Sequence, residues 1–188
     1  MEATQRLFAA ARIPALPGLQ DACRAMAELD PGVRVCPSQD WHLTLKFLGG
    51  TTERQTALLT ELLTNLGAEQ PPLTIELRGL GVFPHLRRPT VIWAGLEAAG
   101  GLARLATQFE ARCEPIGFPP EDRQWQPHLT LARLKNVAPV TLQPLLEQHA
   151  ATDFGTVTIG ELELIASTLH PAGPVYQTCA RIPLRGEV

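Results

Sequence analysis

The tetrapeptide His42-Leu43-Thr44-Leu45 occurs twice in this chain of 188 residues, the second time as His128-Leu129-Thr130-Leu131. Each copy opens a mainly apolar run, which is typical of a strand with a buried face. Side chains alternate between the two faces of a strand, so the His and Thr of each copy share one face and the leucines share the other. The repeat therefore predicts two strands that each turn a His and a Thr towards a cleft and two leucines towards a core.

Two imidazoles and two hydroxyls around one cleft suit chemistry on a phosphate group. One imidazole can accept a proton while the other donates one, because His titrates near neutral pH. The hydroxyls can donate hydrogen bonds to non-bridging phosphate oxygens. A single His in an apolar strand is more often a core or edge residue than a catalyst, but packing gives no reason to repeat both His and Thr at one offset. We therefore predict a catalytic site made of His42, Thr44, His128 and Thr130.

The paired His-x-Thr motifs resemble those of the 2H phosphoesterase superfamily. Within that superfamily, the amino-acid sequences of several segments resemble those of the RNA 2′,3′-cyclic phosphodiesterases, also called 2′-5′ RNA ligase-like proteins. These segments are RLFA (6–9), HLTLKFLG (42–49), GVFP (81–84), RPTVIW (88–93), QPHLTLAR (126–133) and STLHPAGPVY (167–176). The resemblance extends from about residue 5 to residue 184, with Trp125 standing where Phe is common in the family.

The resemblance implies a reaction as well as a fold. His42 would donate a proton to the leaving O3′ of an RNA 2′,3′-cyclic phosphate, and His128 would accept a proton from the attacking water. Thr44 and Thr130 would hold the non-bridging oxygens, and the product would carry a 2′-phosphate. The same chemistry run backwards, with a 5′-hydroxyl RNA in place of water, would form a 2′-5′ linkage. Because two His residues supply the acid and the base, we expect neither a metal nor a cofactor.

The fifth residue after each motif His is Phe47 in the first copy and Arg133 in the second. In the family these positions are associated with base stacking and phosphate contact, and an aromatic ring and a guanidinium suit those tasks. An odd offset points away from the His face of a regular strand, so a bulge or a strand end would be needed. The alternatives are core packing for Phe47 and a surface ion pair for Arg133.

The pattern of apolar residues predicts short strands mixed with helices. Strands are expected at 5–13, 33–35, 41–48, 73–82, 90–96, 128–134, 154–159, 161–167 and 175–184, and helices at 17–29, 52–66, 102–113 and 139–150. Gly49-Gly50 should end the first motif strand, and Gly67 should end the second helix. We predict an α+β fold of mostly antiparallel sheets with helices outside and a central cleft. The similar order of elements around each motif predicts two lobes with pseudo-twofold symmetry, forming one domain over residues 1–188.

Composition limits the partners of the chain. Hydrophobic residues at 45% and charged residues at 19% describe an ordinary globular protein. The net charge of −3 argues against a protein that coats long nucleic acid. A local cluster could still grip an RNA end if certain arginines converge, namely Arg78, Arg87, Arg88, Arg123 and Arg133.

The cysteines lack the spacing of metal ligands, and no apolar run is long enough to span a bilayer. We expect a cytoplasmic monomer with free thiols and no membrane partner. His85 and His149 are expected at the surface because they lack partners at ligand spacing, and His170 is given no role.

Two other functions remain open. The motifs could act on a smaller substrate, such as a cyclic nucleotide, ADP-ribose cyclic phosphate or a 2′-5′ oligonucleotide. The chain could instead be a non-catalytic module that binds RNA ends, although binding alone does not require both an acid and a base.

Overall fold

The computed structural model describes residues 3–121, 125–171 and 173–187. The strands are β1 (Thr4–Arg12), β2 (Val33–Val35), β3 (His42–Thr52), β4 (Leu73–Phe83), β5 (Val91–Glu97), β6 (His128–Leu134), β7 (Asp153–Ile159), β8 (Glu161–His170) and β9 (Gly173–Pro183). The helices are α1 (Pro17–Leu29), α2 (Glu53–Glu69), α3 (Gly100–Cys113) and α4 (Pro139–Gln148), with 3₁₀ turns at Ser38–Asp40 and Glu114–Ile116. Each element predicted from the sequence is present within a few residues of its expected bounds.

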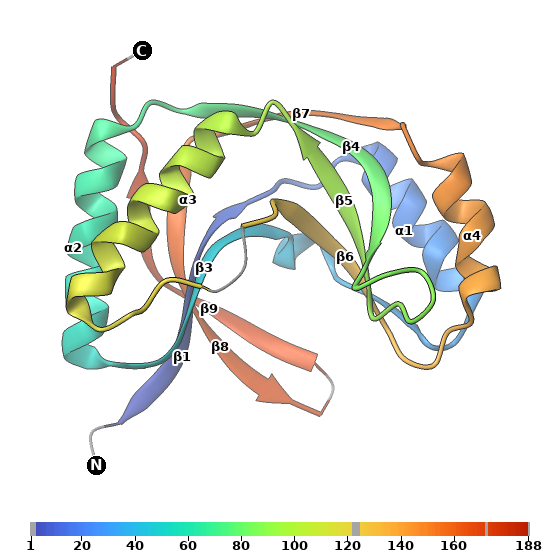
Figure 1. Ribbon diagram of the computed structural model, residues 1–188, viewed down its shortest axis with the longest axis horizontal. Coiled ribbons are helices and arrows are strands. Elements are labelled where there is room, and N and C mark those ends of the chain that lie inside the picture. The colour runs from blue at the N-terminus through green and yellow to red at the C-terminus, as the bar shows by residue number, and fades with distance from the viewer. Residues whose placement is uncertain (1–2, 122–124, 172, 188) are drawn as a thin grey trace.

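The strands form two antiparallel sheets, one in each lobe (Figure 1). The order is β3-β1-β8-β9 in the first sheet and β2-β6-β5-β4-β7 in the second. The predicted α+β fold with antiparallel sheets is therefore confirmed. The sheets are not successive halves of the chain, because β8 and β9 return from the carboxyl end to complete the first sheet and β2 leaves the amino-terminal part to join the second.

The helices cover the outer faces of the sheets and are exchanged between the lobes. α2 and α3 pack on the first sheet, whereas α1 and α4 pack on the second (Figure 1). α3 follows β5 of the second sheet yet crosses to the first, where it contacts β3. Its predicted inward residues are all buried: Leu102, Leu105, Ala106 and Phe109. Every helix buries one face against the outer side of a sheet. The inner faces of the two sheets, which meet between the lobes, are therefore left to form the site.

Two glycine predictions were wrong. β3 continues through Gly49 and Gly50 to Thr52, which caps α2 by accepting a hydrogen bond from the backbone of Gln55. α2 in turn continues past Gly67. A Cβ at Gly67 would lie 2.6 Å from a carbonyl oxygen of β9, so this glycine permits close approach of α2 to β9 rather than ending the helix.

Candidate functional site

The two repeated motifs line one cleft between the sheets. The cleft has a volume of about 990 Å³, and its walls include His42, Thr44, His128 and Thr130. β3 and β6, which carry the motifs, contact each other across the junction of the lobes. In both strands the leucines that follow each His and each Thr are fully or nearly buried, as the alternation predicted. The structure thus brings together the four residues expected to form a site.

Both motif strands carry a bulge at the same place. In β3 the pairing with β1 passes from Thr44 directly to Lys46. In β6 the pairing with β5 passes from Thr130 directly to Ala132. Two successive residues are therefore buried in each strand, and the residues after them return to the His face. The same irregularity in both lobes agrees with their expected pseudo-twofold relation.

The bulges bring the fifth position after each His into the cleft. Phe47 and Arg133 both line it, and Phe47 is 63% exposed, so it is not a core residue. Lys46 takes the inward place in β3, where its Nζ donates hydrogen bonds to Glu110 of α3 at 3.0 Å and to the carbonyl of Pro119 at 2.9 Å. Phe47 and Arg133 therefore lie where they could contact a base or a phosphate in the cleft. The contacts themselves remain predictions.

Each motif His is oriented by a carbonyl two residues earlier in the chain. His42 Nδ1 lies 2.6 Å from the carbonyl oxygen of Asp40, and His128 Nδ1 lies 2.8 Å from that of Gln126. A carbonyl only accepts a hydrogen bond, so Nδ1 must carry the proton in each ring. Nε2 is then the atom that gains or loses a proton, and the two imidazoles have equivalent tautomers.

Aromatic rings fix the planes of both imidazoles. Phe8 of β1 packs on His42 with ring centres 4.9 Å apart, and Tyr176 of β9 meets His42 edge-on at 5.2 Å. Phe83 of β4 meets His128 edge-on at 4.8 Å. An aromatic residue from another strand therefore holds each ring, which limits its rotation within the cleft.

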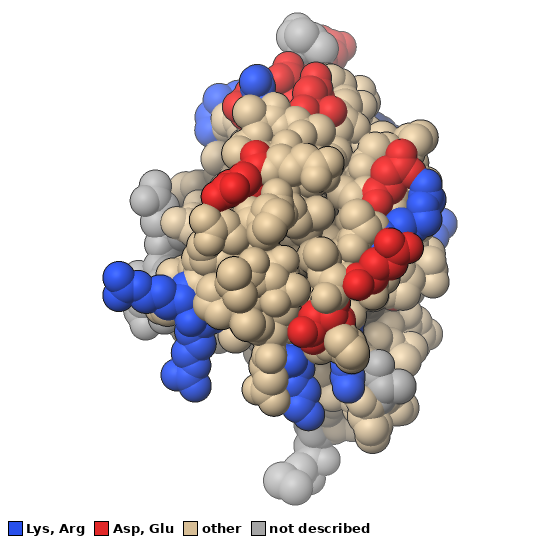
Figure 2. Space-filling view, turned by 90° about the vertical axis from the view of Figure 1, so that its right-hand side faces the viewer, with Lys and Arg blue, Asp and Glu red and all other residues tan. Residues whose placement is uncertain are grey.

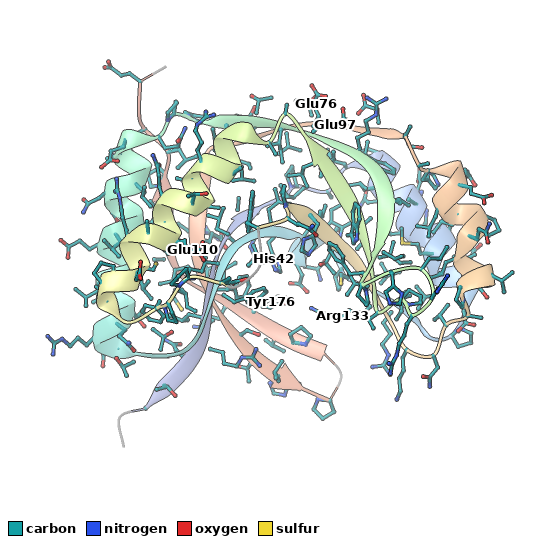
Figure 3. The ribbon with its side chains drawn as sticks, in the orientation of Figure 1. His42, Glu76, Glu97, Glu110, Arg133 and Tyr176 are labelled. Carbon is teal, nitrogen blue, oxygen red and sulfur yellow. The ribbon has the colours of Figure 1, made fainter. Side chains whose placement is uncertain are left out.

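The electrostatic surroundings lower the pKa of His42. Burial is the largest cause, and the charges of Arg12 and Arg133 act in the same direction, while the hydrogen bond and charge of Asp40 oppose them. A lower pKa makes the protonated imidazole a stronger acid. Burial also raises the pKa of the Tyr176 hydroxyl, and the Arg133 guanidinium opposes that rise. Figure 3 shows His42 and Tyr176 near the middle of the molecule with Arg133 beside them on the side of the second lobe.

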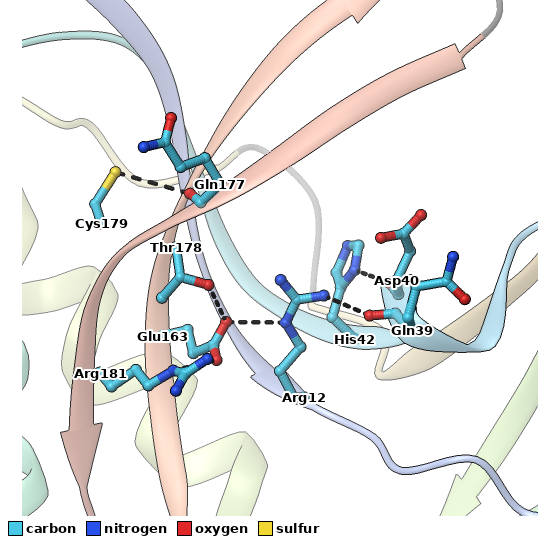
Figure 4. Close-up of polar contacts among 9 residues, drawn as sticks. All are labelled: Arg12, Gln39, Asp40, His42, Glu163, Gln177, Thr178, Cys179 and Arg181. Carbon is cyan, nitrogen blue, oxygen red and sulfur yellow. Dashed lines mark hydrogen bonds and ion pairs between the residues drawn. The ribbon is translucent and has the colours of Figure 1, made fainter.

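Behind His42 a partly buried ion pair supports the turn that precedes β3 (Figure 4). Arg12 pairs with His42 in the β1–β3 ladder. Its Nε donates to a carboxylate oxygen of Glu163 at 2.9 Å, and its Nη1 donates to the Gln39 carbonyl at 3.0 Å. The next carbonyl along the chain, that of Asp40, is the one that orients His42. Arg12 thus connects a buried carboxylate to the segment that positions the first imidazole.

Glu163 is only 2% exposed, although it is a charged residue between Leu162 and Leu164 of β8. Besides Arg12 it accepts hydrogen bonds from Thr178 at 3.0 Å and from Arg181 at 3.2 Å, both in β9. Burial on its own raises the pKa of Glu163, but these hydrogen bonds and positive charges outweigh burial and hold the pKa below its ordinary value. The carboxylate therefore stays charged in the protein interior.

Trp125 connects the segment before β6 to the first motif strand. Its indole Nε1 donates a hydrogen bond to the backbone carbonyl of Thr44 at 2.9 Å. Trp125 lies three residues before His128, so the bond links the approach to β6 with the first motif. A Phe at this position would lack the donor.

Arg133 is the member of the predicted arginine cluster that reaches the cleft. Arg78 forms an exposed ion pair elsewhere, and Arg87 and Arg88 are exposed in the loop after β4. Arg123 lies outside the described residues. Arg78, Arg87 and Arg88 therefore do not join Arg133 at the cleft, and the alternative of scattered surface charges holds for these three.

Two other arginines, Arg6 of β1 and Arg34 of β2, line the cleft instead. The carboxylate that borders it is that of Asp40. The outer end of the second lobe, over α1 and α4, carries interspersed acidic and basic side chains (Figure 2). The cleft therefore carries a local excess of positive charge, although the protein as a whole has a net charge of −3.

Across residues 3–121, 125–171 and 173–187, no helix is long and apolar enough to cross a membrane. Within the same residues, no group of three or more His, Cys, Asp or Glu side chains is placed to hold a metal ion. The four cysteines are free, as predicted, and burial raises the pKa of Cys23 and Cys113 to about 11.

Comparison with known proteins identifies relatives along most of the chain. Residues 21–170 match the model of the 2′-5′ RNA ligase superfamily. A protein of Aquifex aeolicus named RNA 2′,3′-cyclic phosphodiesterase is 35% identical over 150 residues, which cover 79% of this chain and 80% of the relative. A protein of Thermus thermophilus with the same name is 36% identical over 163 residues, covering 83% of this chain and 78% of the relative.

Solved structures share the fold. The Thermus thermophilus protein TT0787 superposes with a TM-score of 0.81 at 33% identity, covering 97% of this chain and 100% of that one. E. coli LigT in complex with 3′-AMP superposes with a TM-score of 0.73 at 26% identity, covering 96% of this chain and 98% of that one. The chain therefore belongs to the 2′-5′ RNA ligase superfamily, as its two His-x-Thr motifs predicted.

Proposed function

We propose that this enzyme hydrolyses the 2′,3′-cyclic phosphate at RNA ends to a 2′-phosphate by general acid–base catalysis with His42 and His128. The relatives above are named for the cyclic phosphodiesterase reaction. One observation supports the mechanism more than any other. Both imidazoles line one cleft, each with Nδ1 held by a backbone carbonyl and Nε2 left to exchange a proton.

The roles follow the resemblance to the family. His128 takes a proton from water, and the water oxygen forms a bond to phosphorus. The bond from phosphorus to O3′ breaks on the opposite side, and His42 gives its proton to O3′. A lowered pKa makes protonated His42 a stronger acid but also reduces the fraction of His42 that is protonated at neutral pH, so the assignment of donor and acceptor rests on the resemblance to the family. If a 5′-hydroxyl RNA attacked in place of water, its oxygen would bond to phosphorus as the bond to O3′ breaks, which would give a 2′-5′ linkage.

Other cleft residues would bind rather than transfer protons. The hydroxyls of Thr44 and Thr130 would donate to the non-bridging oxygens, and Arg133 would balance their negative charge. Phe47, with its exposed ring, would stack on the terminal base. Because strands from both ends of the chain form the first lobe, we infer that residues 1–188 act as one bilobal unit.

The test is an assay in EDTA with a short RNA ending in a 2′,3′-cyclic phosphate, with the phosphate isomer of the product identified. We expect a 2′-phosphate, and loss of about 10²–10⁴ in kcat for His42→Ala and for His128→Ala. His85→Ala is the matched control, because His85 is exposed outside the cleft. A 3′-phosphate product would overturn the assignment of the leaving oxygen, and near-normal rates for either motif variant would overturn the mechanism.

A further inference from the structure

Large hydrophobic side chains gather at the mouth of the cleft. Among the described residues five such side chains are exposed, and three of them line the cleft: Phe47 (63% exposed), Leu169 (64%) and Val175 (56%). Exposed apolar groups add little to folding, because their surface is not removed from water. Their concentration at one opening indicates a contact surface rather than chance.

The β8–β9 hairpin carries this surface outward from the catalytic site. Pairing of β8 with β1 ends at Ala166, so the hairpin beyond it projects from the sheet, as Figure 1 shows. In the hairpin Ser167 pairs with Tyr176 and Leu169 pairs with Pro174. Directly opposed residues share a face of the sheet, as do residues two apart on one strand. Tyr176 contacts His42, so a continuous row of side chains leads from the first imidazole to Leu169 and Pro174.

Charge indicates which kind of molecule would lie along this row. Arg6 and Arg34 line the same cleft as the hairpin, together with Arg133 and against the bordering carboxylate of Asp40. The protein as a whole has a net charge of −3, so the positive excess in the cleft is opposite in sign to the overall charge. An apolar row with arginines beside it matches a single-stranded nucleic acid, which presents base faces and phosphates together.

The size of the cleft agrees with a substrate larger than one nucleotide. Its volume of about 990 Å³ lies at the upper end of the roughly 300–1,000 Å³ typical of sites for small molecules. His42, Thr44, His128 and Thr130 would hold only the reacting phosphate. The lining of the cleft also includes residues of the hairpin together with Arg6 and Arg34.

We propose that Leu169 and Pro174 form a second nucleotide subsite, which binds the residue preceding the cyclic-phosphate terminus of an RNA chain. The inference rests on the proposed function and adds a substrate preference to it. The apolar hairpin covers the base of that residue, and Arg6 faces the phosphate that joins it to the terminal nucleotide. The subsite selects RNA ends over cyclic mononucleotides.

The experiment compares kcat/KM for the dinucleotide adenylyl-adenosine 2′,3′-cyclic phosphate with kcat/KM for adenosine 2′,3′-cyclic phosphate. The wild type should prefer the dinucleotide. Leu169→Ser should reduce this preference about tenfold, since covering most of a Leu side chain is worth roughly 1.4 kcal/mol. Leu169→Met, which keeps an apolar side chain, should retain the preference.

Leu58→Ser is the matched control, because Leu58 is an exposed Leu on α2 away from the cleft, and it should leave the preference unchanged. The ratio is insensitive to partial unfolding, which lowers both activities equally. If the wild type cleaves both substrates equally, or if Leu169→Ser leaves the ratio intact, the subsite is refuted while the proposed function stands. If the wild type cleaves neither substrate, both proposals fail.

Discussion

Replacing Glu163 with Gln removes the negative charge that holds two arginines behind the first motif strand. The side chain is 2% exposed and accepts hydrogen bonds from Arg12, Thr178 and Arg181. Gln keeps the size and one acceptor oxygen, but its amide NH₂ would face a guanidinium. The variant therefore leaves Arg12, 26% exposed, with an incomplete partner in the interior.

The expected cost can be bounded from these exposures. Removing one partner of a fully buried pair costs about 3–5 kcal/mol of unfolding free energy. Arg181 is 67% exposed and regains water readily, and Arg12 regains part of its hydration. We therefore expect Glu163→Gln to lower the free energy of unfolding by about 2 kcal/mol at pH 7.

Urea unfolding followed by circular dichroism measures this loss. Glu97→Gln is the matched control, because Glu97 pairs with Arg78 at 3.2 Å where both side chains are about half exposed. We expect the control to lose less than about 1 kcal/mol. If both variants lose the same small amount of unfolding free energy, the ion pair between Glu163 and Arg12 does not stabilise the first lobe.

The pH dependence supplies an independent check on the charge of Glu163. Its pKa in the folded protein lies below its ordinary value, so its contribution is complete above the unfolded pKa of about 4.3 and is lost as the pH falls through the folded pKa. The difference in unfolding free energy between wild type and Glu163→Gln should thus become smaller at acidic pH. A difference that is constant from pH 7 to pH 3 would refute the assignment of the effect to this carboxylate.

Three further predictions follow from other contacts. Trp125→Phe removes the donor to the Thr44 carbonyl, so kcat should fall about three- to tenfold with the fold retained, and an unchanged kcat would refute a positioning role. In an NMR titration, His42 should show a pKa below about 6.5 that rises when phosphate is added, because burial lowers the pKa and a bound anion raises it; no response to phosphate would place anion binding elsewhere. Gly67→Ala should lower the unfolding free energy by about 1–3 kcal/mol, because its Cβ would overlap β9, whereas Gly160→Ala, with open space around it, should lose less; equal losses would refute the close approach.

The residues that the sequence could predict are those defined by local pattern. The repeat of His and Thr at one offset needed only the alternation of a strand to place four side chains in a common cleft. The bulges were stated as a condition for Phe47 and Arg133 but could not be derived, since they depend on how β3 and β6 pair with their neighbours. Such pairing is not visible in the motif itself.

Contacts between distant segments could not be predicted from one sequence. Arg12 and Glu163 are 151 residues apart, and they meet only because β8 inserts between β1 and β9. A Glu is seldom buried without partners, and the sequence of β8 does not show that Thr178 and two arginines from other strands allow Glu163 to be buried. Arg6 and Arg34 escaped notice for the same reason, because the register of separate strands brings them to the cleft.

The exchange of strands between the lobes bears on the order in which a nascent chain can mature. The second sheet is complete once Ile159 has been synthesised, whereas the first sheet still lacks β8 and β9. At that stage His42 has neither Tyr176 beside it nor Glu163 behind Arg12. Domains fold as their segments leave the ribosome, and pairing over long sequence separation is slow. The first imidazole is thus fixed only after nearly the whole chain has emerged, so a chain released early would contain all strands of the second sheet without the contacts that position His42.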